Sequence, residues 1–395
     1  MKRTTTVIIF LLSVLLCRSV AGEELYVSPS GNDTHPGTRE QPLATLAGAR
    51  DRIRLLHRQR VWRDTIFVRM APGTYPLAEP LTLGHEDSGT EAAPVVYTAA
   101  TDERPVICGG IGTGTFEAVS PNLWRVFVPE TRYGFRFEQL YVNGQRRFRA
   151  QTPNRGEFLK VGRTEEVFLN KSGKDNLYGI QPYFAVQKIF LRPEDAHVLS
   201  DIEPGERHDV MLAVNHFWTH TRKPVNYIDT GDTAWYISGE SLVWDYGINA
   251  KSRYVVENYR KALDAPGEWY LDRDGWLWYI PLPGEEPENV RCVAPVTDKF
   301  LVVRGEPGRP VQHIRFENIR FESTGYLTPA EGNSDPQAAS SIEAVIQLDH
   351  VRHVDFLHCD VAHTGLHAFW FRENCSHSRI ERCHLYDLGG GGVKM

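Results

Sequence analysis

Cysteine and methionine are scarce in this chain of 395 residues, which has six and four of them. Five cysteines remain if residues 1–22 are removed, and an odd number excludes a framework in which every cysteine is paired. The cysteines and histidines lack the spacing of a metal site, and the repeated part of the chain has no acidic cluster with calcium spacing. We therefore expect no metal and no cofactor.

The apolar run at the N terminus, Val7–Leu16, is too short to span a bilayer. Lys2 and Arg3 precede it, and the small residues at 20–22 follow it, which is the pattern of a secretory signal. We predict a signal peptide over residues 1–22 and a protein that is secreted or periplasmic. After signal cleavage we expect no membrane association.

Basic charge is also low relative to acidic charge. The chain has 44 Lys and Arg against 50 Asp and Glu, and removal of residues 1–22 takes away three basic side chains. The mature chain therefore has a net charge of about −9 by formal counting. This balance disfavours nucleic acid and anionic membranes as partners, whereas a neutral or cationic polymer is easier to accommodate.

A repeat near the C terminus is what the sequence does contain. The segments 311–325, 351–365 and 375–389 align with apolar residues in alternate columns, and each ends on glycine. Their starts are 40 and then 24 residues apart, so the basic repeat is 24 residues and the first copy carries an insertion of 16. Period-2 alternation predicts strands with one buried face. A repeat of this kind without helices predicts a parallel β-solenoid.

The repeat predicts which residues face inward. Two inward columns are expected, made of Phe316, Phe356 and Ile380, and of Ile319, Cys359 and Cys383. The two cysteines are favoured as buried thiols, although a coil spacing of about 4.8 Å does not exclude a bridge. A further column of His313, His353 and His377 is expected to be a structural stack.

Two other segments depart from the repeat. Thr45 can cap an amphipathic helix over residues 46–56, which would cover the open end of the solenoid. From Gly112 to Glu288 the repeat vanishes, strand-like runs recur, and the Asp-Gly pair at 274–275 predicts a hairpin. This segment is predicted to be an inserted all-β domain, resembling a sandwich.

The predicted fold class is therefore all-β, a parallel β-helix of about 24 residues per coil. Residues 392–395 begin a further coil at the same offset, so we expect a fragment whose C-terminal coils are missing. The predicted division is 1–22 signal peptide, 23–111 N-terminal cap and first coils, 112–288 inserted domain, and 289–395 truncated β-helix coils.

Several motifs resemble the start of exported right-handed parallel β-helix carbohydrate enzymes: residues 25–33, 41–46, 71–75 and 86–90. The inserted domain, residues 267–272 and the turn at 387–394 look like glycoside hydrolase family 141. The resemblance implies a right-handed coil and hydrolysis of plant or algal cell-wall polysaccharide, as by an α-L-fucosidase or a xylanase. It also places the catalytic carboxylates beyond residue 395. A polysaccharide or oligosaccharide substrate is thus expected.

Two other functions stay open. A polysaccharide lyase acting on uronic acids would use the same fold, although such lyases typically want a calcium site of clustered Asp and Glu. A non-catalytic carbohydrate-binding β-helix protein would need no carboxylate pair. The fold alone does not decide among the three.

The candidate site residues lie at the ends of successive repeats. Asp387 precedes a run of four glycines, where the backbone permits close approach of a ligand, so it is a candidate catalytic acid or substrate contact. It can instead cap the turn. His363 and His367 are candidate sugar contacts or solvated turn residues, and Trp370 can stack on a sugar or pack in the core. Glu343 lies in the long loop 326–343, which is expected to shape a groove with the inserted domain.

Overall fold

The computed structural model describes residues 22–59, 64–171, 182–216, 218–241, 247–334 and 337–395. The predicted signal peptide lies outside the described residues, except for Gly22. The regular elements of the described chain are mostly strands, with few helices, so the predicted all-β class is confirmed. Within the described ranges no helix is long and apolar enough to cross a membrane.

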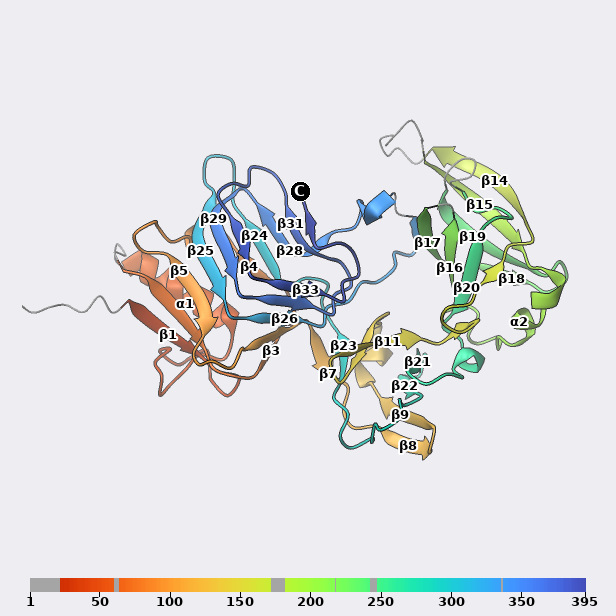
Figure 1. The fold of residues 1–395 in the computed structure, drawn as a ribbon, viewed down its shortest axis with the longest axis horizontal. Coiled ribbons are helices and arrows are strands. Elements are labelled where there is room, and N and C mark those ends of the chain that lie inside the picture. The colour runs from red at the N-terminus through yellow and green to blue at the C-terminus, as the bar shows by residue number, and fades with distance from the viewer. Residues whose placement is uncertain (1–21, 60–63, 172–181, 217, 242–246, 335–336) are drawn as a thin grey trace, which may run out of the picture.

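Three sheets contain only parallel pairs, and together we call them the parallel stack (Figure 1). Their strands come from residues 23–108 and 301–394, with residues between them contributing none. The first sheet is β1(Glu23–Val27), β2(Ile66–Met70), β5(Val95–Ala99), β25(Val311–Glu317), β29(Val351–Leu357) and β32(Arg379–Glu381). The second is β3(Thr74–Pro76), β6(Val106–Cys108), β26(Arg320–Glu322), β30(Asp360–Ala362) and β33(His384–Tyr386). The third is β4(Leu81–Leu83), β24(Leu301–Arg304), β28(Ala344–Asp349), β31(His367–Phe371) and β34(Val393–Lys394).

The predicted inward columns are paired in register. Phe316 pairs with Phe356, and Phe356 pairs with Ile380. The rings of Phe316 and Phe356 stack with centroids 5.1 Å apart, and both side chains are fully buried. Ile380 packs half-buried against the same core, as does Cys383 below the buried Cys359. The five described cysteines are all free, so the expectation of thiols at Cys359 and Cys383 is confirmed.

The corners of the stack are left-handed turns made by residues other than glycine. His313, His353 and His377 have φ of 54°, 53° and 56°; the first two rings stack with centroids 4.7 Å apart, and the third is tilted at 5.0 Å from the second. Equivalent positions thus take the same uncommon backbone conformation in each repeat, held by strand pairing on both sides. The predicted histidine ladder is therefore observed. Asp387, with φ of 46°, occupies another such corner.

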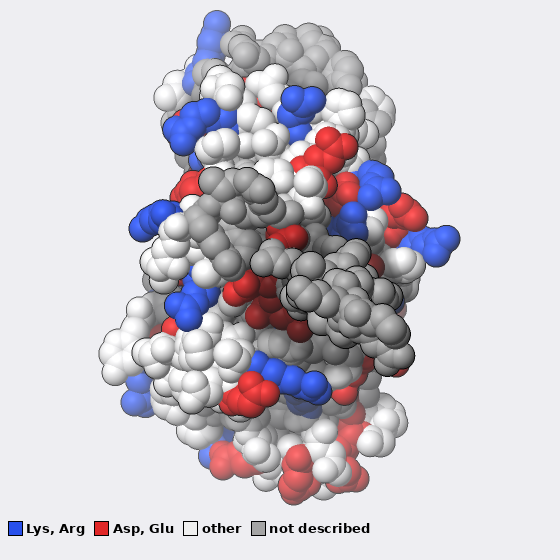
Figure 2. Space-filling model, turned by 90° about the vertical axis from the view of Figure 1, so that its left-hand side faces the viewer, with Lys and Arg blue, Asp and Glu red and all other residues white. Residues whose placement is uncertain are grey.

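Helix α1(Leu46–Gln59) covers one end of the stack, as predicted. Leu46, Ala49 and Ile53 are buried on one face. Thr45 Oγ1 accepts a hydrogen bond from the Gly48 N–H at 2.8 Å, which is the expected N-cap. Figure 2 looks onto this end of the molecule, where basic and acidic side chains are interspersed.

The strands of residues 110–295 form three further sheets, one of which gains an edge strand from residues 333–334, and we call residues 110–295 the inserted segment. An eight-stranded mixed sheet has the order β7(Gly110–Gly112), β23(Cys292–Pro295), β10(Leu140–Val142), β11(Gln145–Arg149), β21(Glu268–Leu271), β22(Trp276–Tyr279), β9(Leu123–Phe127) and β8(Glu117–Ser120). β21 and β22 form the predicted hairpin. β7 and β23 pair at Gly112 and Val293, so both ends of the segment emerge side by side.

Two more sheets of the inserted segment share one buried cluster, which includes Leu212 and Trp235. One contains β12(Gln151–Thr152), β20(Arg253–Glu257), β16(Met211–His216), β17(Thr219–Pro224) and β27(Asn333–Ser334), with β13(Leu159–Lys160) beside β20. The other is β14(Arg163–Lys171), β15(Tyr183–Phe190), β19(Ala234–Ser241) and β18(Tyr227–Asp229). The short helices are η1(His85–Asp87), η2(Pro129–Tyr133), η3(Pro193–Asp195), α2(His197–Ser200), η5(Arg260–Ala262) and η6(Gln337–Ala339).

Two details differ from the sequence-based expectation. The solenoid coils were expected to resume at residue 289, but β23 is antiparallel to β7 and β10, and the parallel strands resume at Leu301. The apolar run of β23 carries no information on strand direction. The segment also has two buried clusters, one around Trp235 and one around Trp269, where a single sandwich has one.

Candidate functional site

The loop of residues 326–343, which leaves the parallel stack after β26, reaches the inserted segment. Its short strand β27 adds to the edge of β17, with Ser334 opposite Thr221 and Asn333 opposite Arg222. The loop thus connects the parallel stack with the inserted segment. Two cavities of about 320 and 370 Å³ lie along it, and Tyr326, Asn333 and Ile342 line both of them.

The cavity of about 370 Å³, which we call the arginine cavity, is lined by Arg146, Arg222, Glu138, Trp218 and His220 together with parts of the loop. Arg222 Nη2 lies 2.8 Å from Glu257 Oε2 and 3.2 Å from Glu138 Oε2. Guanidinium and carboxylate groups at such distances form charge-assisted hydrogen bonds that fix both partners. This wall is thus polar and held in place.

The cavity of about 320 Å³, which we call the carboxylate cavity, is lined by Asp298, Glu343, Glu240 and Glu331. Lys299 Nζ lies 2.5 Å from Asp298 Oδ2 and 2.8 Å from Glu343 Oε2, so the two carboxylate oxygens are no more than 5.3 Å apart. Partial burial favours the neutral form of Glu343, but the Lys299 ammonium outweighs it and lowers the pKa of Glu343. Glu343 is therefore ionised at neutral pH.

Asp387 connects the stack with the inserted segment. Its Oδ2 accepts a hydrogen bond from His363 Nδ1 at 2.7 Å, and its Oδ1 accepts one from Arg146 Nε at 2.9 Å. Burial would raise the pKa of Asp387, but these two partners lower it below its ordinary value. A carboxyl group held ionised in this way is unsuited to be a general acid. Its neighbours Gly365 and Gly389 line the arginine cavity.

His363 is not a solvated turn residue or a free sugar contact. Its side chain is buried between the rings of Tyr141 and Tyr386, with centroids 5.6 and 5.4 Å away. Tyr141 belongs to β10, and its hydroxyl donates to the Thr324 carbonyl at 2.9 Å. His363 therefore helps to dock the inserted segment on the corner of the stack.

His367 is also buried, so it is not solvated either. Its Nε2 donates to the Ala339 carbonyl at 3.0 Å, and its Nδ1 accepts from the Gly391 N–H at 2.5 Å. It thus supports the loop from below. Trp370 is half-exposed on β31, with Lys394 Nζ 3.7 Å and Arg372 Cζ 4.4 Å from its ring. Cations cover it, so it is not a core residue.

Of the five predicted site residues, Glu343 alone lines one of these two cavities. His363, His367 and Asp387 hold the walls, and Trp370 lies on the outer face of the third parallel sheet. The lining residues Glu138, Arg146 and Asp298 were not predicted. They belong to no repeat and match no motif, so the sequence carried no signal for them.

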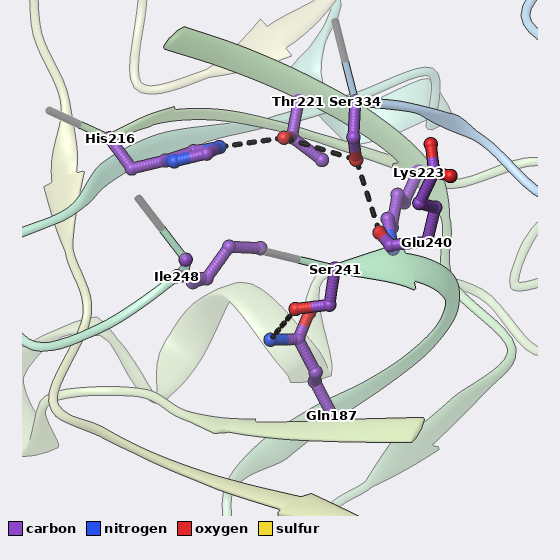
Figure 3. A pocket seen from close by; sticks show the side chains of 9 residues that line it. Gln187, His216, Thr221, Lys223, Glu240, Ser241, Ile248 and Ser334 are labelled. Atoms are coloured by element: carbon purple, nitrogen blue, oxygen red, sulfur yellow. Dashed lines mark hydrogen bonds between the residues drawn. The ribbon is translucent and has the colours of Figure 1, made fainter. Parts of the chain in front are cut away.

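A buried polar network lies beneath β27 (Figure 3). Thr221 Oγ1 hydrogen-bonds His216 Nε2 at 2.6 Å and donates to Ser334 Oγ at 3.3 Å, and Ser334 Oγ donates to the Glu240 carbonyl at 3.2 Å. Lys223 Nζ donates to the same carbonyl at 2.5 Å. Burial lowers the pKa of Lys223 to about 8. His216 is buried in this network.

Within the described ranges, no three or more His, Cys, Asp or Glu side chains are arranged to hold a metal ion. The two cavities are lined by carboxylates, guanidinium groups, hydroxyls and aromatic rings. A carboxylate can accept hydrogen bonds at both of its oxygens, and an arginine side chain can donate two parallel hydrogen bonds. This set suits a ligand that carries many hydroxyl groups.

Comparisons with known proteins bear on the fold. No protein-family model matches the chain. The uncharacterized protein YwoF of Bacillus subtilis (strain 168) is 36% identical over 89 residues, which cover 22% of this chain and 16% of that protein. The match thus spans a small part of that relative's length.

Two solved structures are similar over most of this chain. One, described as a glycoside hydrolase, has a TM-score of 0.70 and 22% identity and covers 93% of this chain and 74% of its own. The other, described as the complex of XylC with xylose, has a TM-score of 0.42 and 12% identity and covers 93% and 54%. The first likeness shows that this chain has the fold of the protein described as a glycoside hydrolase.

Proposed function

We propose that this protein is an exported glycoside hydrolase that acts on plant or algal cell-wall polysaccharide, as an α-L-fucosidase or a xylanase does. The proposal includes a secreted or periplasmic location. It also takes the parallel stack as coils of a right-handed parallel β-helix and residues 112–288 as an inserted domain, related to glycoside hydrolase family 141. The fold of the neighbour described as a glycoside hydrolase supports this proposal.

The observation that carries the proposal is the pair of polar cavities between stack and insert. They combine carboxylates, arginines and the half-exposed Trp218, which are groups that bind sugar hydroxyls and stack on sugar rings. Asp298 and Glu343 stand no more than 5.3 Å apart at their nearest paired oxygens.

Glu343 is proposed to contact substrate as an ionised carboxylate. In that state it accepts hydrogen bonds from sugar hydroxyls and can stabilise positive charge that develops on a sugar ring. Asp387 is proposed to act through Arg146, by fixing the wall on which the inserted segment rests. It is thus a positioning residue rather than a catalytic acid.

The test is hydrolysis of fucosylated pectin fragments and xylan by the exported protein. New reducing ends without unsaturated products support hydrolysis, and unsaturated uronate products would show a lyase instead. Glu343→Gln is expected to lower the rate about tenfold or more, equal to about 1.4 kcal/mol of transition-state stabilisation. The control Glu306→Gln, in an exposed turn, is expected to leave it unchanged. Binding without cleavage would favour a carbohydrate-binding protein.

A further inference from the structure

We propose that the loop of residues 326–334 and 337–343, here called the strap, makes the site accept a chain end or a short branch of a saccharide. The middle of a linear polymer would not fit. This inference rests on the proposed function, because it names the part of the substrate that the same site takes. It follows from how the strap is fixed and from what lies on its two sides.

The inserted segment holds the beginning of the strap. The Tyr326 N–H donates to Gln139 Oε1 at 2.6 Å, and the Thr328 N–H and Oγ1 donate to Glu138 at 3.0 and 2.8 Å. Further along, β27 pairs with β17. Side chain and backbone contacts thus fasten this half of the strap at three points, with Glu138 itself bound by Arg222.

The parallel stack holds the end of the strap. His367 Nε2 donates to the Ala339 carbonyl at 3.0 Å. Lys394 Nζ donates to the Ser340 and Ile342 carbonyls at 2.7 and 2.9 Å. Because both regions hold the strap, it crosses the groove as a fixed bridge and not as a free loop tip.

Very little room is left between the strap and the inserted segment. A Cβ on Gly239 would lie 2.2 Å from the Glu331 carbonyl oxygen, and one on Gly332 would lie 2.6 Å from Lys223 Cγ. The hydrogen bonds from Thr221 through Ser334 to the Glu240 carbonyl close the same contact (Figure 3). A sugar chain therefore cannot pass between the strap and these strands.

The strap thus separates the two cavities, which share Tyr326, Asn333 and Ile342 in their walls. Their volumes of about 320 and 370 Å³ stand at the low end of the roughly 300–1,000 Å³ typical of small-ligand pockets. Each holds a few sugar rings at most. The carboxylate and arginine cavities are two short compartments, whereas a polymer-binding cleft is one continuous groove.

The test measures affinity against chain length by calorimetry, using xylo-oligosaccharides from xylobiose to xylohexaose and fucosylated pectin fragments. The affinity is expected to change by less than about threefold once the compartments are filled, from xylotriose onward. Products of cleavage are expected to be released from chain ends, with little early loss of polymer viscosity. A rise of about tenfold from xylotriose to xylohexaose, or a rapid loss of viscosity, would overturn the inference while the proposed function stands.

The strap itself is tested by Gly332→Ala, whose methyl group would push it away from Lys223. This variant is expected to bind xylohexaose about threefold or more tighter than xylotriose, because the groove opens. The matched control Gly308→Ala has a similar positive φ of 78° at a site with open space. Its affinity should remain nearly independent of oligosaccharide length. If affinity depended on oligosaccharide length equally in both variants, the proposed role of the strap would be overturned. No binding and no cleavage of any probe would overturn the proposed function as well.

Discussion

The inward columns of the parallel stack and the interior of the inserted segment bury different kinds of side chains. In the stack, equivalent residues of successive repeats lie about 4.8 Å apart, so a charged residue recurring in an inward column would lie next to a like charge. The inward columns are accordingly apolar, as at Phe316 and Phe356. The inserted segment buries the charged side chains Arg147, Lys223 and Glu268. The comparison teaches that repetition favours apolar ladders, while a segment without repeats can bury charge at single positions.

The largest loss of stability is expected from substitutions that create a cavity in either core. Phe356→Ala in the stack and Trp235→Ala in the inserted segment should each cost about 3 to 5 kcal/mol of unfolding free energy, because both side chains are fully buried. If the two regions unfold as separate units, urea titrations should show each variant moving a different transition. Equal shifts of one common transition in both variants would make the regions a single cooperative unit.

The buried amine of Lys223 should make the stability of the inserted segment rise with pH. Its folded pKa of about 8 lies below the ordinary 10.5, so the unfolded chain binds more protons between these values and stability increases across that window. Relative to Lys223→Met, the wild type should gain roughly 3 kcal/mol from about pH 7 to pH 11. Unfolding curves at several pH values measure this difference. A constant difference between the two proteins would contradict a depressed pKa.

A substitution at Gly239 should disturb the contact between the inserted segment and the strap. Alanine at this position has a φ of +115° and a Cβ 2.2 Å from the strap, so Gly239→Ala should cost about 1 to 3 kcal/mol. The control Gly284→Ala has a φ of +87° with nothing within 4 Å, and separates backbone strain from the clash. Thermal unfolding measures both. A smaller loss for Gly239→Ala than for Gly284→Ala would mean that the strap yields freely.

The smallest effect is expected from Arg146→Ala at the corner of the stack. The Arg146–Asp387 pair is partly exposed, so its loss should cost about 1 kcal/mol. The folded pKa of Asp387 is below the ordinary 3.8, so its contribution is full above that pH and is lost as the pH falls through the folded pKa. The difference between wild type and variant should shrink there to the part contributed by the hydrogen bonds from Arg146 Nη2 to the Thr364 and Asp387 carbonyls. Arg309→Ala, in an exposed pair with Glu306, should show no such pH dependence.

The same comparison explains how much the sequence could predict. In the stack, Phe316 and Phe356 recur at a fixed spacing, so their burial and pairing followed from the pattern. The helix cap at Thr45 and the hairpin at Asp274–Gly275 depend on neighbouring residues, so they could also be predicted from the sequence. The pairing of β23 with β7 was missed because its partners are about 180 residues away in sequence and no period marks them.

The same limit applies to the candidate site: residues marked by the repeat could be predicted, and their distant partners could not. Glu343 was found because it lies in an insertion into the repeat, and Asp387 because it precedes the glycine run. Their partners Lys299 and Arg146 were not found. Arg146 lies 241 residues from Asp387 in the sequence. Only the fold brings these two together, and it turns Asp387 from a candidate acid into an ionised docking group.

The most direct test of a saccharide site between the two regions is amide hydrogen exchange with and without a bound xylo-oligosaccharide or fucosylated pectin fragment. Slower exchange is predicted in both regions at once: in β10 and β11 of the inserted segment, in β27, and in residues 343–348 of the stack. The outer strands β25 and β29 should be unchanged. Protection confined to the outer sheets of the stack, with none in the inserted segment, would contradict the proposed site.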